Sequence, residues 1–168
     1  MKNPLHYFLI IPIVFILLFA IQCTESEPGE AETTTAEIEN PQFDSELASE
    51  LGADEYGMRR YVMALLKAGP NQNQSESEAI ELQRGHMDNI HRLAEEGKLI
   101  LAGPFLGGGE LRGIYVFDVT TIEEARELTE TDPAIQAGRL KMELIPWYGS
   151  AALQQVNEIH NRISQTNP

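Results

Sequence analysis

Residues 112–119, RGIYVFDV, limit the possible folds of this chain more than any other segment. Successive side chains of a strand point to opposite faces of a sheet. Here one face receives isoleucine and valine, and the other receives tyrosine, phenylalanine and valine. An antiparallel sheet with one solvated face alternates polar and apolar residues instead. We therefore expect a sheet that is covered on both of its faces.

The order of elements in residues 56–149 predicts how that sheet is built. Hydrophobic periodicity and turn residues give alternating strand and helix signals. The strands are expected at 60–66, 98–105, 112–119 and 139–148, and the helices at 76–96 and 121–131, with a short helix at 133–137. The order strand, helix, strand, strand, helix, strand is the ferredoxin-like arrangement. The fold class is thus α+β, with an antiparallel four-stranded sheet and both helices on one face.

The other face of the sheet needs a cover that these helices do not provide. We favour a second copy of the chain packed sheet against sheet, which makes a two-fold homodimer. The rival is an amphipathic helix expected at 151–163, within a C-terminal region of residues 150–168. Its apolar face consists of Leu153, Val156, Ile159 and Ile163.

The first 23 residues predict export. Lys2 is followed by an unbroken apolar run at 7–21, which is short for a membrane-spanning helix and typical of a signal-peptide core. The chain's single cysteine, Cys23, comes directly after it, so no internal disulfide is possible. The arrangement resembles a bacterial lipoprotein site, with Cys23 lipidated and the protein held at the periplasmic or cell-surface side of a membrane. An uncleaved anchor and simple secretion remain as alternatives.

Residues 24–55 carry much of the negative charge. Eleven acidic residues and no lysine or arginine occur there, out of a net charge of −14. We expect an acidic, disordered tether with a short helix at 43–52. No basic patch occurs anywhere in the chain, which argues against a nucleic-acid partner.

Two polar residues are candidates for chemistry. His86 interrupts the apolar stripe of the helix at 76–96, and Asp132 precedes a proline after the helix at 121–131. Because both helices lie on one face of the sheet, an imidazole and a carboxylate from them can meet as a proton-transfer pair. The alternative roles are structural: a core histidine with a backbone partner, and a turn or cap aspartate.

Other familiar motifs are absent. The glycines at 107–109 precede a strand rather than a helix, so they predict a hairpin and not a phosphate loop. His86 and His91 are five residues apart and diverge around the helix, and no cluster of histidine or cysteine suggests a metal site. We expect neither a metal nor an organic cofactor.

Several short motifs arrive in the order found in the YCII-related (YciI-like) domain family. They are RGHM at 84–87, EGKL at 96–99, AGP at 102–104, TTIEEA at 120–125, Asp132-Pro133, Gly138 and IPW at 145–147. The resemblance spans roughly residues 59–148. It implies a dimeric α+β barrel, made of two ferredoxin-like subunits joined face to face. It also implies that His86 and Asp132 match a proposed His–Asp active pair, and that relatives act on small organic acids as dehydrochlorinases or isomerases.

These observations lead to one functional hypothesis and one alternative. The first is an exported, membrane-associated enzyme that uses His86 and Asp132 in an elimination, isomerisation or hydrolysis of a small polar or anionic molecule. Gln83, Arg84 and Arg112 are candidate substrate contacts. The alternative is a non-catalytic binding or interaction module at the cell surface. The signal, the acidic tether and the C-terminal helix depart from the compact form of the family.

Overall fold

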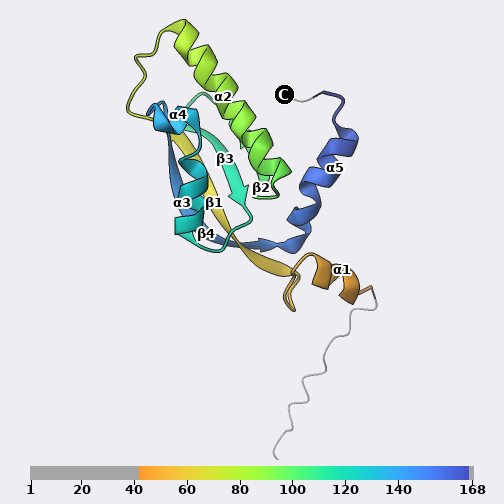
Figure 1. Cartoon of the computed structure of the whole chain (residues 1–168). Helices are drawn as coiled ribbons and strands as arrows, with labels where there is room; N and C mark the ends of the chain where they lie inside the picture. Colours follow the sequence, from red (N-terminus) through yellow and green to blue (C-terminus); the bar gives the residue numbers. More distant parts are fainter. Residues whose placement is uncertain (1–41, 167–168) are drawn as a thin grey trace, which may run out of the picture. The chain divides into compact units, whose positions relative to one another are not determined.

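The computed structural model describes residues 42–166, which contain one four-stranded antiparallel sheet (Figure 1). Its strands are β1 (Met58–Ala68), β2 (Leu99–Pro104), β3 (Leu111–Phe117) and β4 (Leu140–Ser150). They lie in the order β2-β3-β1-β4. Chain order and sheet order together are those of the ferredoxin-like βαββαβ fold, so the predicted fold class is confirmed. Residues 105–110 connect β2 to β3 as the expected hairpin.

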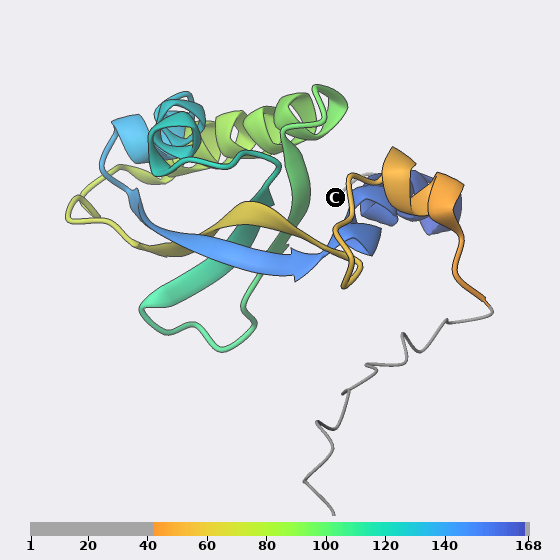
Figure 2. The same cartoon turned by 90° about the horizontal axis from the view of Figure 1, so that it is seen from below.

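Three helices lie on one face of the sheet, as Figure 2 shows from below. They are α2 (Glu76–Glu95), α3 (Ile122–Thr129) and α4 (Pro133–Gln136). Local sequence explains where they begin. Ser75 starts α2 and Thr121 starts α3, each in a capping box with the glutamate three residues later. Gly97, at a φ of +69°, follows α2 and allows the chain to turn into β2.

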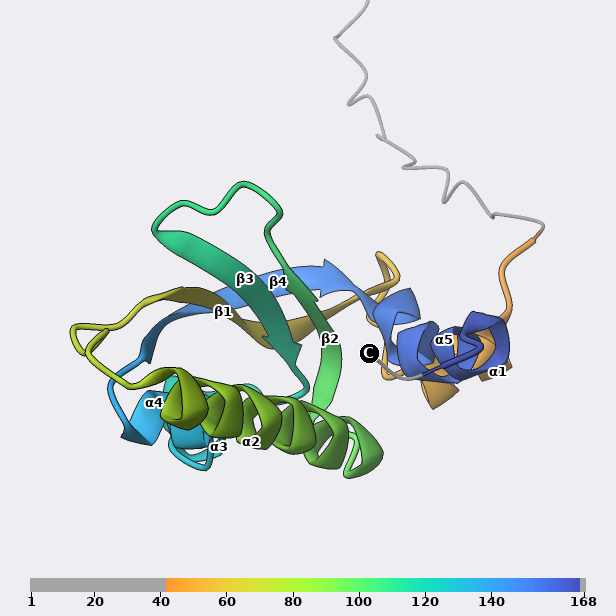
Figure 3. The same ribbon diagram turned by 90° about the horizontal axis from the view of Figure 1, so that it is seen from above.

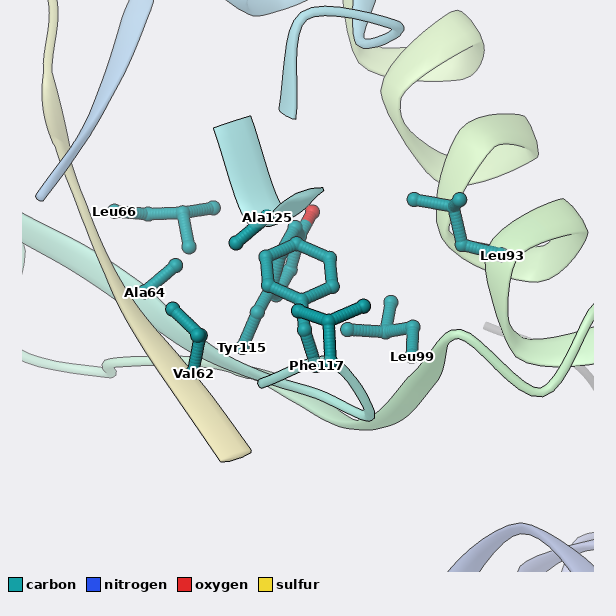
Figure 4. Close-up of a cluster of buried hydrophobic side chains, with 9 residues drawn as sticks. Val62, Ala64, Leu66, Leu93, Leu99, Tyr115, Phe117 and Ala125 are labelled. Carbon is teal, nitrogen blue, oxygen red and sulfur yellow. The ribbon is translucent and has the colours of Figure 1, made fainter. Parts of the chain in front are cut away.

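The main core lies between these helices and the sheet. It is formed by alternate residues of the strands together with one side of each of α2 and α3 (Figure 4). Its buried members are Val62, Ala64, Leu66, Leu93, Leu99, Tyr115, Phe117, Val119 and Ala125. The second set of alternating residues faces the other side, as the apolar pattern of β3 predicts.

That opposite face is covered in part by the C-terminal segment. Tyr61, Ile100 and Val116 form a second buried cluster, against which Leu153 and Val156 pack. The outer residues of the same segment stay exposed, at 48% for Ile159 and 74% for Ile163. Elsewhere on this face Met63, Leu65 and Ile114 are half-buried and Ile145 is 37% exposed. The C-terminal segment therefore covers this face of the sheet only in part. The homodimer stays a prediction.

The C-terminal segment differs in detail from the single helix expected at 151–163. It begins as a 3₁₀ turn, η1 (Ala151–Gln155), and continues as α5 (Val156–Ile163). The side-chain amide of Asn157 donates to the backbone carbonyl of Leu99 at 2.8 Å. Because β2 is an edge strand, this bond occupies a carbonyl that no neighbouring strand reaches, and it holds α5 beside β2 (Figure 3).

Ordered structure begins before residue 56, where the sequence placed the start of the domain. A short helix, α1 (Ser45–Glu50), lies within the expected range 43–52. The segment after it is tied to the sheet, because Arg59 donates to the carbonyl of Leu51 at 2.9 Å and the hydroxyl of Tyr148 donates to Asp54. Residues 42–55 are thus not a disordered tether. Residues 24–41 of that tether and the signal at 1–23 lie outside the described residues.

None of the helices in the described part of the chain is both long enough and apolar enough to cross a membrane.

Candidate functional site

A close approach of two helices brings the candidate residues together. Gly85 of α2 faces Pro133, the first residue of α4, and a Cβ added at Gly85 would lie 3.1 Å from the Pro133 ring. The missing side chain lets α4 approach α2. His86 follows that glycine and Asp132 precedes that proline, so the same contact places both polar side chains at the helix junction.

His86 and Asp132 form a buried pair. The Nδ1 atom of His86 and the Oδ2 atom of Asp132 are 2.6 Å apart. Asp132 is 0% exposed and His86 is 8% exposed. The other carboxylate oxygen, Oδ1, accepts the backbone N–H of Ala134 at 2.8 Å, which fixes the orientation of the carboxylate. A carboxylate only accepts hydrogen bonds, so Nδ1 carries the hydrogen and Nε2 is the nitrogen available to take up a proton.

Tyr115 completes the pair on its other side. Its hydroxyl lies 3.2 Å from Nε2 of His86, and the two rings stack with their centroids 6.1 Å apart. Burial, and to a smaller extent the negative charge of Asp132, raises the pKa of the Tyr115 hydroxyl well above its usual range. The phenol therefore keeps its proton at neutral pH and donates to Nε2.

A second polar cluster supports the loop that carries Asp132. The side-chain oxygen of Asn89, which is buried on α2, accepts from Arg92 at 2.8 Å and from the hydroxyl of Thr131 at 3.0 Å. Thr131 immediately precedes Asp132. The cluster fastens α2 to the turn between α3 and α4 on the C-terminal side of His86.

The pair borders a large cavity. A cavity of about 1010 Å³ lies between α2, β2 and α5, and both His86 and Tyr115 line it. Its wall combines apolar surface with polar side chains that include His86, Tyr115 and the arginines Arg112 and Arg139, a mixture that suits a small-molecule site. His86 is thus buried against the carboxylate of Asp132 and at the same time lines the cavity.

The three predicted substrate contacts divide. Gln83 and Arg112 line the cavity, whereas Arg84 is exposed and is not part of its wall. The reason is helical geometry, since one residue further along α2 turns a side chain by about 100°. Cys23, the predicted lipidation site, lies outside the described residues. Within residues 42–166, no three His, Cys, Asp or Glu side chains are grouped to hold a metal ion.

Sequence reasoning missed Tyr115 and Asn89. Tyr115 was counted only among the apolar residues of its strand. Its available signal was the phenolic hydroxyl, which needs a hydrogen-bond partner when the residue faces a core. Asn89 gave a similar signal, as an amide three residues after His86 on the inner side of α2.

The fold and the site define an α+β protein of ferredoxin-like topology that holds a buried His–Asp pair beside a cavity. The YCII-related domain model matches residues 61–148, and the chain belongs to that family. A relative in Bacillus subtilis (strain 168), the uncharacterized protein YjpA, is 32% identical over 63 residues, which are 38% of this chain and 72% of the relative.

One similar solved structure is the 5-chloro-2-hydroxyhydroquinone dehydrochlorinase TftG from Burkholderia phenoliruptrix AC1100, in complex with 2,5-dihydroxybenzoquinone. The two chains are 20% identical, and their match covers 53% of this chain and 93% of the dehydrochlorinase, with a TM-score of 0.40.

Proposed function

We propose that this chain is an enzyme that acts on a small polar or anionic molecule by proton transfer at His86. The reaction is an elimination, an isomerisation or a hydrolysis, with His86 as general acid and base and Asp132 as the residue that orients its ring. A positioned general acid or base typically contributes about 10²–10⁴-fold to a rate. Histidine suits the task because its side chain gains and loses a proton near neutral pH.

One observation carries this proposal: the 2.6 Å contact between His86 Nδ1 and Asp132 Oδ2 beside a cavity of about 1010 Å³. A buried carboxylate held by a backbone N–H stabilises the protonated ring that forms when Nε2 takes up a proton. Tyr115 remains protonated, so its hydroxyl can turn from Nε2 to donate to an oxygen of the bound molecule. His86 and Tyr115 then act on the substrate together, while Asp132 holds the imidazole from behind.

The decisive experiment replaces His86 by Gln. Glutamine can hydrogen-bond but cannot carry a proton, so turnover of small organic acids should fall by about 10²–10⁴-fold while the fold is retained. Asp88, an exposed residue on the same helix that does not line the cavity, gives the matched control as Asp88→Asn. Turnover that survives H86Q at the level of D88N would exclude the catalytic role.

A second function is favoured by a different observation. Both ring nitrogens of His86 have protein partners and the residue is only 8% exposed, which also suits a structural histidine in a non-catalytic binding module. In that case H86Q melts at a lower temperature than the wild type, because a buried partner loses its hydrogen bond. The free energy of unfolding should fall by about 1–3 kcal/mol. Lower stability without any loss of turnover would favour this module over the enzyme.

We also propose that the protein is exported and anchored to a membrane through a lipid on Cys23. The proposal rests on the charged start, the apolar run at 7–21 and the cysteine that follows it. Mass spectrometry of the mature N-terminus tests it: a lipidated cysteine as first residue supports the anchor. An unprocessed Met1 or an unmodified cysteine contradicts it.

The proposed assembly is a homodimer through the part of the sheet that the C-terminal segment leaves open. Met63, Leu65, Ile114 and Ile145 form an incompletely covered apolar surface there. A charge at its centre, Met63→Asp, should make a dimer dissociate because an unpaired carboxylate would be buried. Light scattering after gel filtration measures the mass, and a wild-type monomer would rule out the dimer.

A further inference from the structure

The cavity beside His86 is an elongated groove. On α2 its wall begins at Gln83 and ends at Glu95, a span of about 18 Å at 1.5 Å per helical residue. Its other long wall is β2, which runs from Leu99 to Pro104 over about 16 Å at 3.3 Å per strand residue. The two walls agree in length. A groove of that length suits a molecule considerably longer than a simple two- or three-carbon acid.

The two ends of the groove differ in charge. Gln83, Arg112 and Arg139 line one end. Within residues 42–166 neither guanidinium forms an ion pair with a carboxylate, and Arg139 donates only to the neutral side chain of Gln74, at 3.0 Å. At the other end Glu95 is the one carboxylate of the lining, and the polar side chains beside it are His91 of α2 and Asn157, His160 and Asn161 of α5. A negative group on a ligand is therefore attracted to the arginine end and repelled from the far end.

The middle of the groove is apolar. Met87 and Ile90 of α2 line it together with Ala102 of β2, and Ala94 continues this lining toward the far end. These side chains have no hydrogen bonds to offer a ligand. Binding along this stretch therefore comes from the burial of apolar surface, at roughly 25 cal/mol per Å² removed from water.

The far end is lined by α5, which lies outside the family match at 61–148. Val156 and Asn157 contribute to the wall, and the bond from Asn157 to the carbonyl of Leu99 holds the helix there. The C-terminal helix thus sets the length of the groove.

We propose that the groove binds an amphipathic carboxylate, with its carboxylate between Arg112 and Arg139 and its hydrocarbon chain extending past Ile90 to α5. His86 is three residues along α2 from Gln83, about 4.5 Å, so the carbons next to the carboxylate lie beside its ring. The inference rests on the proposed function only in taking this groove as the substrate site, and it names the class of substrate.

Isothermal titration calorimetry with decanoate below its micelle threshold tests the inference. Decanoate should bind with one-to-one stoichiometry, and decanol should bind at least about tenfold more weakly because its neutral hydroxyl can form neither an ion pair nor a bidentate pair with a guanidinium group. R112Q and R139Q should each weaken decanoate binding by about tenfold, whereas the control R126Q, on the exposed side of α3, should not. Equal affinity for decanol, or equal loss in all three variants, overturns the inference.

A second variant tests the role of the far end. Octanoate should bind roughly tenfold more weakly than decanoate, because two methylene groups fewer are buried. Ala94→Phe fills the groove near α5 and should remove this preference for the longer chain while octanoate still binds. A preference that persists in A94F would show that the chain does not reach α5, and the inference fails.

These binding experiments separate the inference from the proposed function. D88N should bind decanoate as wild type does, since Asp88 is exposed and lies outside the groove. Loss of turnover in H86Q on some other molecule, without decanoate binding, would leave the enzyme proposal intact and exclude the amphipathic carboxylate. Decanoate binding without any turnover that depends on His86 would support the amphipathic carboxylate and exclude the enzyme proposal.

Discussion

Replacement of Asp132 by Asn should move the hydrogen on the ring of His86 from Nδ1 to Nε2. The amide oxygen can keep the bond from the N–H of Ala134, which Oδ1 accepts at 2.8 Å in the wild type. The amide NH₂ then takes the place of Oδ2, opposite Nδ1 of His86. A donor cannot face a donor, so the ring hydrogen moves to Nε2 and donates to the hydroxyl of Tyr115. Nε2 can then no longer act as a base.

The cost in stability follows from the geometry of the pair. The lost hydrogen bond joins a charged group to a ring at 2.6 Å in a buried site, a class of bond that contributes about 1.5–3 kcal/mol. The new bond from the amide to Nδ1 is neutral and restores about 1 kcal/mol. We expect a net loss of about 0.5–2 kcal/mol, or roughly 2–8 °C in Tm for a domain of this size.

Two measurements test this prediction. Nitrogen NMR identifies which ring nitrogen of His86 carries the hydrogen, with H86Q used to assign the signal, and thermal unfolding gives the Tm. Asp118→Asn is the control, because Asp118 pairs with Arg59 at 2.6 Å where both side chains are partly exposed, and it should cost under about 1 kcal/mol. The same tautomer in wild type and D132N, or a smaller loss than in D118N, would refute the reasoning.

Three further predictions follow from contacts around the site. Gly85→Val should cost about 1–3 kcal/mol in urea unfolding by overpacking against Pro133, whereas Gly85→Ala should be nearly neutral, since its gain in helix propensity offsets the 3.1 Å contact; equal effects would contradict this. Tyr115→Phe should make stability fall less steeply above about pH 10, because the raised pKa of Tyr115 means that this tyrosine ionises only in the unfolded state; parallel pH curves from chemical denaturation would argue against its burial. Asn157→Ala should speed amide hydrogen exchange in α5 but not in α2, since it removes the bond to the carbonyl of Leu99, and unchanged exchange in α5 would count against that anchoring role.

The subunit fold was predictable because its signals are local. The capping box at Thr121 and the two-sided apolar pattern of β3 each depend on a few neighbouring residues. The amphipathic pattern of the C-terminal segment was equally visible, but a pattern shows that a face exists and not what it touches. In the structure Val156 packs against the sheet while Ile163 remains exposed, a division that no periodicity contains.

The site was predictable only as a pair of candidates. His86 drew attention because it interrupts an apolar stripe, and a carboxylate on the same side of the sheet could be named. The 2.6 Å contact itself depends on the approach of Pro133 to Gly85, which is a tertiary contact without a local signal. A classification of residues as either polar or apolar fails for Tyr115, because its ring packs in the core while its hydroxyl contacts His86.

The position of β1 has a mechanical consequence. This first strand is central: it pairs with β4 from Met58 to Ala68 and with β3 from Val62 to Lys67, whereas β4, the last strand, is an edge and pairs only with β1. Tension from the N-terminal side must shear two ladders at once, while tension from the C-terminal side can peel one. We expect a higher rupture force for the first geometry in single-molecule pulling, and equal forces would contradict this. The N-terminal end of the domain is then the end that resists more tension before its strand separates from the sheet.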